Sequence, residues 1–396
     1  MQDALAPEIG DEAREPSETR RGPEILSLTS LRSLAAIEVV LLHTLFELGG
    51  QSAQSLPTIV VELLTRGATA VTFFFVLSGF ILAYTYADAS GMKGTPRKFW
   101  RARFARIYPL YLLGFLIDVP RVTALFLTTT PSLKVAVAKL SVAGVAYLAL
   151  IQSWHPRVSN TFNTPGWSLS TEAFFYAVFP ALLALTRTGS FRRIFGIVLA
   201  TWALPIFAYG CVSHLRLVDL ESNSFKTFWR SFPPLHLPEF ALGVAMGRLF
   251  VAGRVRGKER LVCWAGVAAS VFILLLSGYP KLVPELLQTS LLAPLFAVVV
   301  LAVGSGALPT FGWLDGAALV LLGRASYAVY ILHQPLKTVF MMVARWAGLD
   351  GPSPRLLLGY LIFVELCGVS LFLYFEDPLR RYLRERSRST EASARF

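Results

Sequence analysis

Long apolar runs separated by short polar stretches form the dominant pattern of this chain. A helix that crosses the hydrocarbon core of a bilayer needs about 20 mostly apolar residues. We expect helices in eleven such runs, at roughly 30–48, 68–86, 107–127, 135–152, 172–186, 194–212, 236–252, 261–278, 286–305, 317–341 and 355–375. No period repeats between them and no low-complexity linker divides them. The pattern therefore predicts one all-α, polytopic membrane domain over residues 27–384.

The composition excludes a soluble enzyme. Hydrophobic residues make up 54% of the 396 positions and charged residues 16%, with a mean hydropathy of +0.56; soluble domains are about 45–50% apolar and about 25% charged. The net charge of +12 does not indicate nucleic-acid binding, because Lys and Arg cluster between the apolar runs. The cysteines Cys211, Cys263 and Cys367 show no metal-ligand spacing. We expect no metal and no tightly bound cofactor.

The positions of Lys and Arg favour about ten transmembrane helices. If the N-terminus is cytoplasmic and all eleven runs cross, 18 Lys and Arg lie inside and 19 outside. If the run 135–152 makes no net crossing, 25 lie inside and 12 outside, as the positive-inside rule requires. Lys139 in this run would also cost about 2.5–3.5 kcal/mol at the bilayer centre. We predict a re-entrant or outer-leaflet element at 135–170, both termini in the cytoplasm, and a place in the cell membrane.

The two ends of the chain differ from the membrane domain. Residues 1–26 are rich in acidic residues and proline and almost lack large apolar side chains, so we expect a disordered cytoplasmic tail. This tail is not a signal peptide, because no basic stretch leads directly into an apolar core. Residues 385–396 are expected to form a cytoplasmic C-terminal tail.

Ionisable side chains in the first run are candidates for function, since the bilayer penalises them unless they are paired or face a cavity. Arg32 and His43 are eleven residues apart, so they share a helix face and lie about 16 Å apart along the axis. One could hold the far end of a long ligand while the other acts on its near end. A buried histidine bonded to a neighbouring helix, with Arg32 as a topology anchor, is the alternative.

Two further segments contain candidate residues. Arg103 and Arg106 share a helix face at the expected cytoplasmic mouth, and the guanidinium fork suits phosphate groups; positive-inside anchors are the alternative. Glu172 lies in the first turn of the run 172–186, where the helix dipole alone would favour an acid. Ser78 and Gly79, and the pair Gly243 and Gly247, are interpreted as helix-packing positions.

Taken in order, six segments resemble the family-3 membrane acyltransferases, which O-acylate sugars, glycans and some secondary metabolites. The matching segments are Leu31-Arg32 with ten residues to His43, Phe74-Phe-Val-Leu-Ser-Gly-Phe80, Arg103-x-x-Arg106-Ile-Tyr-Pro109, Trp167-Ser-Leu-Ser-x-Glu172-x-x-Phe-Tyr176, Ser326-Tyr-Ala-Val-Tyr-Ile-Leu-His333 and Glu376-Asp-Pro378. The resemblance spans residues 27–384 and is that of a stand-alone form without a C-terminal hydrolase-like domain.

The resemblance implies roles for the candidate residues. His43 would be catalytic, with Arg32 essential at the cytoplasmic end, and Glu172 would belong to the same machinery. Arg103 and Arg106 would lie at the acyl-CoA site. Trp167, in the signature before the fifth span, would also bind substrate. Acyl-CoA, with acetyl-CoA expected, would be the donor, and a sugar, glycan or glycoside the acceptor, with membrane lipid around the protein. A transporter or flippase for an acylated or lipid-linked glycan is the competing interpretation.

Overall fold

The computed structural model describes residues 23–383 except for 66, 89–90, 187–190, 217–218, 221, 279–284, 308 and 350. The predicted tails at 1–26 and 385–396 therefore lie outside the described residues, apart from positions 23–26. The long helices are α1 (Leu26–Gln54), α3 (Gly67–Tyr86), α4 (Pro96–Thr129), α5 (Leu133–Leu148), α7 (Trp167–Leu185), α8 (Phe191–His214), α10 (Leu237–Val251), α11 (Glu259–Gly278), α12 (Glu285–Gly304), α13 (Ala317–Trp346) and α14 (Pro354–Leu371).

Shorter elements connect these helices. They are α2 (Thr58–Leu64), α6 (Pro156–Ser159) and α9 (Asn223–Ser231), the 3-10 segments η1 (Gln152–Trp154), η2 (Thr164–Gly166), η3 (Pro233–His236) and η5 (Pro309–Asp315), the π-helical η6 (Phe372–Glu376), and an antiparallel pair of two-residue strands, β1 (Ala87–Asp88) and β2 (Gly91–Met92). Each of the eleven predicted runs coincides with a long helix. Most ends agree to within about six residues, but α4 begins at Pro96, eleven residues before the predicted start at 107. The all-α prediction is confirmed for the described residues, with this small hairpin as an addition.

Six helices of the described chain are long and apolar enough to cross a membrane: those within Thr58–Tyr86, Pro96–Thr129, Thr164–Leu185, Arg192–His214, Glu259–Leu276 and Pro354–Leu383. The predicted total of about ten stays a prediction. Helices α1 and α13 have 29 and 30 residues, more than a crossing needs. Ionisable side chains such as Arg32 and Arg324 lower their hydropathy, which is typical of membrane helices that face a protein interior.

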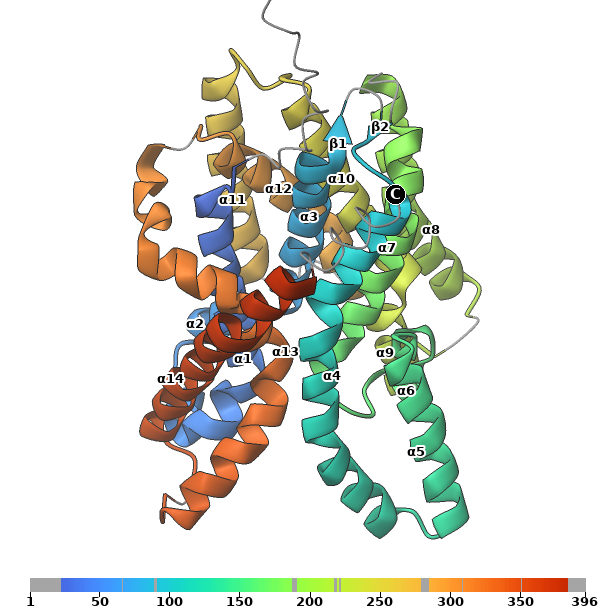
Figure 1. Ribbon diagram of the computed structural model, residues 1–396, viewed down its shortest axis with the longest axis vertical. Coiled ribbons are helices and arrows are strands. Elements are labelled where there is room, and N and C mark those ends of the chain that lie inside the picture. The colour runs from blue at the N-terminus through green and yellow to red at the C-terminus, as the bar shows by residue number, and fades with distance from the viewer. Residues whose placement is uncertain are drawn as a thin grey trace, which may run out of the picture.

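The predicted irregular element at 135–170 is an interrupted helical path. Helix α5 has only 16 residues and returns beside α4 to about the middle of the molecule, where α7 continues upward (Figure 1). The broken stretch between them is stabilised by side chains: Gln152 Nε2 donates to Gly166 O and Ser170 Oγ donates to Leu150 O, both at 2.7 Å. Non-helical backbone at such depth is tolerated only where protein or a cavity surrounds it. With 16 residues, α5 is also too short to cross a bilayer by itself, because a crossing needs about 20.

Contacts between distant segments gather several loops at one end of the molecule. Tyr84 Oη donates to Pro23 O at 3.0 Å, so the entry to α1 lies beside the end of α3. Arg248 on α10 donates to Asp88 O (2.6 Å) and to Thr186 O (3.1 Å). The segments before α1, between α3 and α4, after α7 and at the end of α10 therefore share one end, shown at the top of Figure 1.

An ion pair joins the segment before α1 to α13 at this same end. Arg324 Nη2 lies 2.7 Å from Glu24 Oε2. Burial raises the pKa of Glu24, but hydrogen bonds from Arg324 and from Thr29 together lower it by more than burial raises it. The pKa of Glu24 therefore lies below its ordinary value. Both side chains of the ion pair are more than two-fifths exposed, so the pair contributes little to stability.

Glycine residues set the contact between α3 and α10, as the sequence pattern predicted. A Cβ at Gly243 would lie 1.9 Å from Val76 O, and one at Gly79 would lie 2.2 Å from Phe240 O. No residue with a side chain fits there unless the two backbones separate. This contact holds α3 in place, and α3 forms one wall of the cavity described below.

We expect Gly243→Ala to destabilise the protein, because the new methyl group would overlap a backbone carbonyl that cannot move independently. The loss in the free energy of unfolding should be about 1–3 kcal/mol or more. Gly210→Ala is the matched control, since Gly210 lies in α8 with no atom within 4 Å of its Cβ position, and alanine favours a helix over glycine by about 1 kcal/mol. The measurement is the Tm of the detergent-solubilised variants. Equal Tm values would show that the α3–α10 contact can relax.

Candidate functional site

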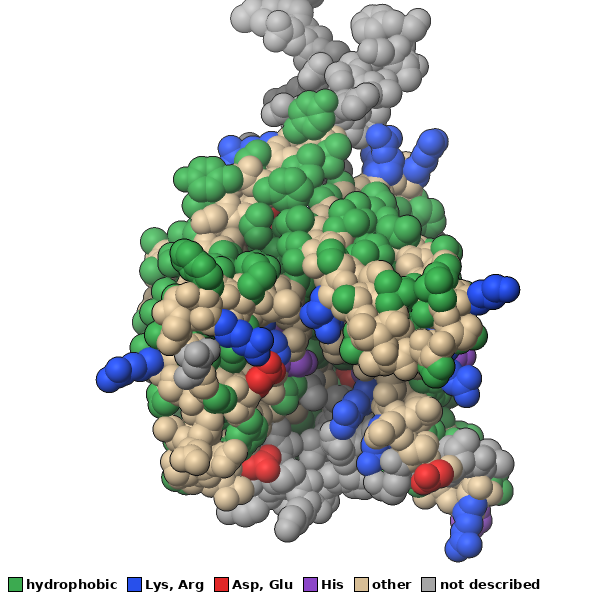
Figure 2. Space-filling model, turned by 90° about the horizontal axis from the view of Figure 1, so that it is seen from below, with side chains coloured by type: hydrophobic (Ala, Val, Ile, Leu, Met, Phe, Trp, Pro, Cys, Tyr) green, Lys and Arg blue, Asp and Glu red, His purple; other side chains and the backbone are tan. Residues whose placement is uncertain are grey.

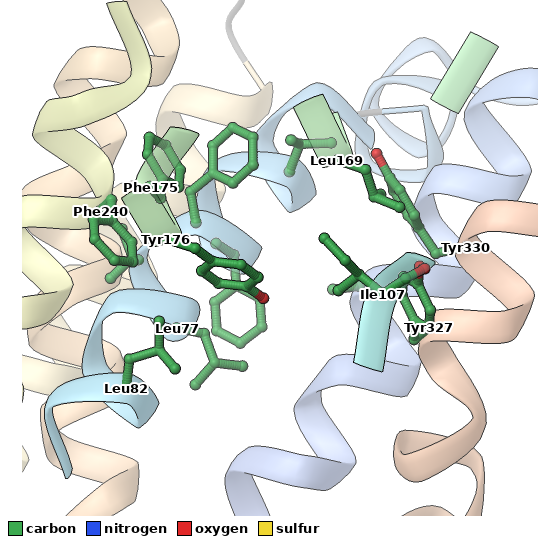
Figure 3. Packing of buried hydrophobic residues seen from close by; sticks show 14 of the residues in the cluster. Leu77, Leu82, Ile107, Leu169, Phe175, Tyr176, Phe240, Tyr327 and Tyr330 are labelled. Atoms are coloured by element: carbon green, nitrogen blue, oxygen red, sulfur yellow. The ribbon is translucent and has the colours of Figure 1, made fainter. Parts of the chain in front are cut away.

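A cavity of about 130 Å³ lies between α1, α3, α4, α7 and α13, and polar side chains make up much of its lining. These polar residues are Arg32, Ser78, Arg103, Arg106, Ser168, Glu172, Tyr176, Ser326, Tyr327 and Tyr330. Apolar residues such as Leu77, Leu82 and Leu169 complete the wall, and Figure 3 shows three of the tyrosines on opposite sides of the space. Four of the six residues selected from the sequence thus meet in one cavity, although they come from three helices.

The cavity has a positive lining. Arg32, Arg103 and Arg106 face a single lining carboxylate, that of Glu172, so the formal charge of the lining is +2. Arg103 and Arg106 share one face of α4, as their spacing predicted. Low-dielectric walls strengthen the field of such a cluster, so an anion is favoured there.

The arginines are held in place by neighbours outside the cavity. Arg103 donates to Tyr86 Oη at 3.3 Å and lies over the Tyr86 ring at 5.5 Å, while its Nε is buried with no hydrogen-bond partner among the described residues. Arg106 lies 4.0 Å from the Glu376 carboxylate, which is also 3.6 Å from Arg380. Glu376 is almost fully buried at the π-helical end of α14, so this carboxylate fixes α14 against α4.

Glu172 forms a small hydrogen-bonded group on the opposite wall. Ser78 Oγ donates to Glu172 Oε1 at 3.2 Å, and Tyr176 Oη donates to the same oxygen at 2.5 Å. The Tyr176 hydroxyl points into the space between the two walls (Figure 3). The sequence interpretation gave Ser78 only a packing role, whereas in the structure Gly79 makes the helix contact and Ser78 faces the cavity. Ser78 and Gly79 are adjacent on α3, so their side chains point in different directions, and this was the signal in the sequence that they have different roles.

Trp167 lies behind the cavity wall and does not line it. Its ring contacts Phe75, which does line the cavity, with the two centroids 6.1 Å apart. The indole ring also packs against His236 at 5.4 Å, and His236 in turn contacts Phe75 at 5.3 Å. The structure therefore places Trp167 in the layer of side chains behind Phe75, and its predicted role in substrate binding stays a prediction.

Sequence reasoning missed a buried polar pair next to Trp167. His236 Nδ1 lies 3.2 Å from the Glu239 carboxylate, and Nε2 lies 2.9 Å from Arg230 O. Both side chains are buried. The available signal was the His-x-x-Glu spacing at the start of the run 236–252. The pair fixes the η3–α10 junction on which Trp167 packs.

His43 lies outside the cavity, beside a second histidine. The rings of His43 on α1 and His333 on α13 are 5.2 Å apart at 67°. Tyr330 lines the cavity and contacts the His333 ring at 6.3 Å, so the histidine pair begins just beyond one end of the cavity. The sequence singled out His333 only as part of a motif. Its partnership with His43, across 290 positions, is a product of the α1–α13 packing.

Backbone hydrogen bonds define the tautomers of both rings. His43 Nδ1 lies 3.0 Å from Val39 O, and His333 Nδ1 lies 2.7 Å from Tyr330 O. A carbonyl can only accept, so each Nδ1 holds a proton and each Nε2 has its lone pair free in the neutral ring. His333 Nε2 is buried without a hydrogen-bond partner in the described chain. Within that part of the chain, no cluster of three or more His, Cys, Asp or Glu side chains could hold a metal ion.

Comparison with known proteins identifies the family. A profile of the family described as an acyltransferase domain matches residues 25–374, which include the cavity and the histidine pair. The chain belongs to this acyltransferase family. It is therefore an enzyme that transfers acyl groups other than amino-acyl groups, as the six motifs predicted, which favours the enzyme over the transporter or flippase.

Two relatives match the acyltransferase over most of their length. The acyltransferase MdmB of Streptomyces mycarofaciens is 32% identical over 316 residues, which cover 78% of this chain and 77% of that protein. The exopolysaccharide production protein ExoZ of Rhizobium meliloti (strain 1021) is 29% identical over 327 residues, covering 81% of this chain and 92% of the relative. No solved structure matches the acyltransferase.

Proposed function

We propose that this acyltransferase moves an acyl group, acetyl in the simplest case, from acyl-CoA to a hydroxyl of a sugar, glycan or glycoside, with His43 as the base. The observation that carries the proposal is the arrangement along α1: a cationic cavity at Arg32 and a histidine pair at His43, with Tyr330 between them. The name of one relative supports the acceptor class, since ExoZ is an exopolysaccharide production protein.

The cationic cavity suits the phosphates of a CoA thioester. Arginine binds phosphate through two parallel N–H donors, and three arginines converge here. Arg32 and His43 are about 16 Å apart along the helix axis, as eleven residues of α1 require. A ligand that spans them must have its anionic part separated from its reacting carbon by a long neutral arm. CoA has this form, because its pantetheine arm joins the phosphates to the thioester.

The histidine pair supplies the proton chemistry. In the transfer, the acceptor oxygen forms a bond to the thioester carbonyl carbon, and the carbon–sulfur bond breaks. His43 Nε2 takes the hydroxyl proton as that bond forms and returns it to the departing thiolate, so the enzyme ends unchanged. The Nδ1 hydrogen bond to Val39 O holds the ring in the tautomer that this step needs.

We place the end of the molecule that contains Pro23, Asp88, Thr186 and Arg248 in the cytoplasm of a cell-membrane protein. The 25-to-12 distribution of Lys and Arg supports this orientation. Acyl-CoA is made in the cytoplasm, and the arginine cavity lies on the side of the histidine pair nearer this end.

Cysteine labelling tests the orientation. In a background without the three native cysteines, Lys258→Cys should react with a membrane-impermeant maleimide only after the cells are opened, because Lys258 lies in the loop between α10 and α11 at the proposed cytoplasmic end. Ser213→Cys, near the end of α8, should react in intact cells. The reverse labelling pattern would contradict the proposed orientation.

His43→Ala should abolish acyl transfer and leave the amount of inserted protein normal, because the base is lost while the helix is kept. The assay uses purified protein in nanodiscs with labelled acetyl-CoA and a panel of p-nitrophenyl glycosides. His214→Ala is the control, since this histidine is exposed at the end of α8. Retained activity in His43→Ala would remove His43 from catalysis, and loss of the protein itself would indicate a structural role.

Arg103→Lys and Arg106→Lys should weaken use of the donor more than use of the acceptor. Lysine keeps the charge but loses the planar fork. Charge-assisted hydrogen bonds contribute about 1.5–3 kcal/mol, so the donor KM should rise about tenfold or more while the acceptor KM changes little. Arg101→Lys is the matched control, because Arg101 is exposed on the same helix.

Direct binding of CoA completes this test. Unchanged CoA affinity in Arg103→Ala and Arg106→Ala would contradict the placement of the donor. If the wild-type protein did not bind CoA at all, the acyl-CoA donor itself would be wrong.

A further inference from the structure

A charged pair lies one helical turn beyond the two histidines. Glu47 follows His43 by four residues on α1, and Lys337 follows His333 by four residues on α13. Lys337 Nζ donates to Glu47 Oε2 at 2.5 Å. Residues four apart lie on the same face of a helix. The two helices therefore meet at two successive contacts, first between the rings of His43 and His333 and then in the ion pair of Glu47 and Lys337.

The charged pair is shielded unequally. The Lys337 side chain is 13% exposed, whereas that of Glu47 is 56% exposed. Figure 2 views the molecule from its lower end and shows a hollow in which Lys or Arg, acidic and His side chains gather. The donor cavity lies on the other side of the histidines, toward Tyr330 and Arg32. The Glu47–Lys337 pair therefore lies on the side of His43 opposite to the donor.

We propose that Glu47 and Lys337 form the acceptor subsite, in which they bind a second hydroxyl of the sugar and so direct another hydroxyl of the same ring to His43. This inference rests on the proposed function and adds the residues that recognise the acceptor. Glu47 accepts a hydrogen bond from the hydroxyl, and Lys337 donates one to its oxygen. A hydroxyl is both donor and acceptor, so this pair uses both of its hydrogen-bonding roles.

The spacing of these two contacts along the helices suits a sugar ring. Four residues of α-helix rise about 6 Å, so His43 and Glu47 present their polar atoms about one ring apart. A pyranose has hydroxyls on several of its carbons, and one of them can reach Nε2 of His43 while another, across the ring, reaches the charged pair. A membrane lipid with a single hydroxyl could not use both positions. The pair thus selects for polyhydroxylated acceptors.

The ion pair at the opposite end of the same two segments provides a comparison. Glu24 and Arg324 also join the region of α1 to α13, at 2.7 Å, but their side chains are exposed to similar extents, 41% and 44%. That pair lies near the cytoplasmic end, far along the helix from His43. A variant of Glu24 therefore removes a similar α1–α13 link without reaching the proposed acceptor subsite.

The experiment measures acceptor kinetics with p-nitrophenyl β-glucoside and its monodeoxy analogues, in nanodiscs with labelled acetyl-CoA. For the wild type, one deoxy analogue should raise the acceptor KM on the order of tenfold. Glu47→Gln and Lys337→Met should raise the KM for the parent glucoside to a similar degree and should no longer distinguish that analogue. The donor KM should stay within about twofold, and Glu24→Gln should keep the wild-type acceptor pattern.

Other outcomes separate the inference from the proposed function. If Glu47→Gln and Lys337→Met lower the Tm but keep the wild-type acceptor KM and its dependence on that hydroxyl, the pair only links two helices and the inference is wrong, while the acyl-transfer function stands. If the wild type binds CoA but acylates none of the glycosides, the sugar acceptor is wrong and the subsite falls with it.

Discussion

The cost of placing charge inside a membrane bundle is the constraint on which the rest of this structure depends. An isolated ion in a low-dielectric interior is penalised by several kcal/mol, so it is retained only with a compensating partner or beside a polar cavity. Arg106 and Arg380 compensate the buried Glu376. Arg103 is held by Tyr86, and Glu172 by Ser78 and Tyr176. These contacts join α3, α4, α7 and α14 around one space, so the same interactions that make the charges tolerable also define the cavity.

Two other features of the fold position the walls of this cavity. The glycine contact between α3 and α10 brings their backbones together, so α3 is held from behind and presents Ser78 and Leu82 to the cavity. The broken segment between α5 and α7 brings Glu172 into the bundle in the second turn of α7, because this helix begins at Trp167 and not at the predicted position 172. Hydrogen bonds from Gln152 and Ser170 satisfy the irregular backbone of the broken segment. Rigid backbone on both walls makes the positions of the charged groups precise, which a binding site requires.

Helices α1 and α13 arrange the functional groups in series. Arg32, His43 and Glu47 follow one another along α1, and Tyr330, His333 and Lys337 follow along α13. The cationic cavity, the histidine pair and the charged pair therefore follow one another along these two helices. In the proposed reaction, donor and acceptor approach His43 from opposite sides. Such an arrangement allows a thioester made on one face of the membrane to meet a hydroxyl that enters from the other.

The sequence by itself determined the class of protein, the helices and the family, because these depend on local properties. Apolar run length predicts each helix, and helical spacing places Arg103 beside Arg106 and glycines at a helix contact. The six motifs indicated an acyltransferase, and four of the six selected residues meet in one cavity. Only the tertiary structure decided that Trp167 supports Phe75 from behind, that Ser78 faces Glu172, and that His43 has His333 as its neighbour. The physical reason is that spacing along one helix fixes a direction but not a partner. Partners are set when helices pack, and α1 meets α13 across almost 300 residues of chain.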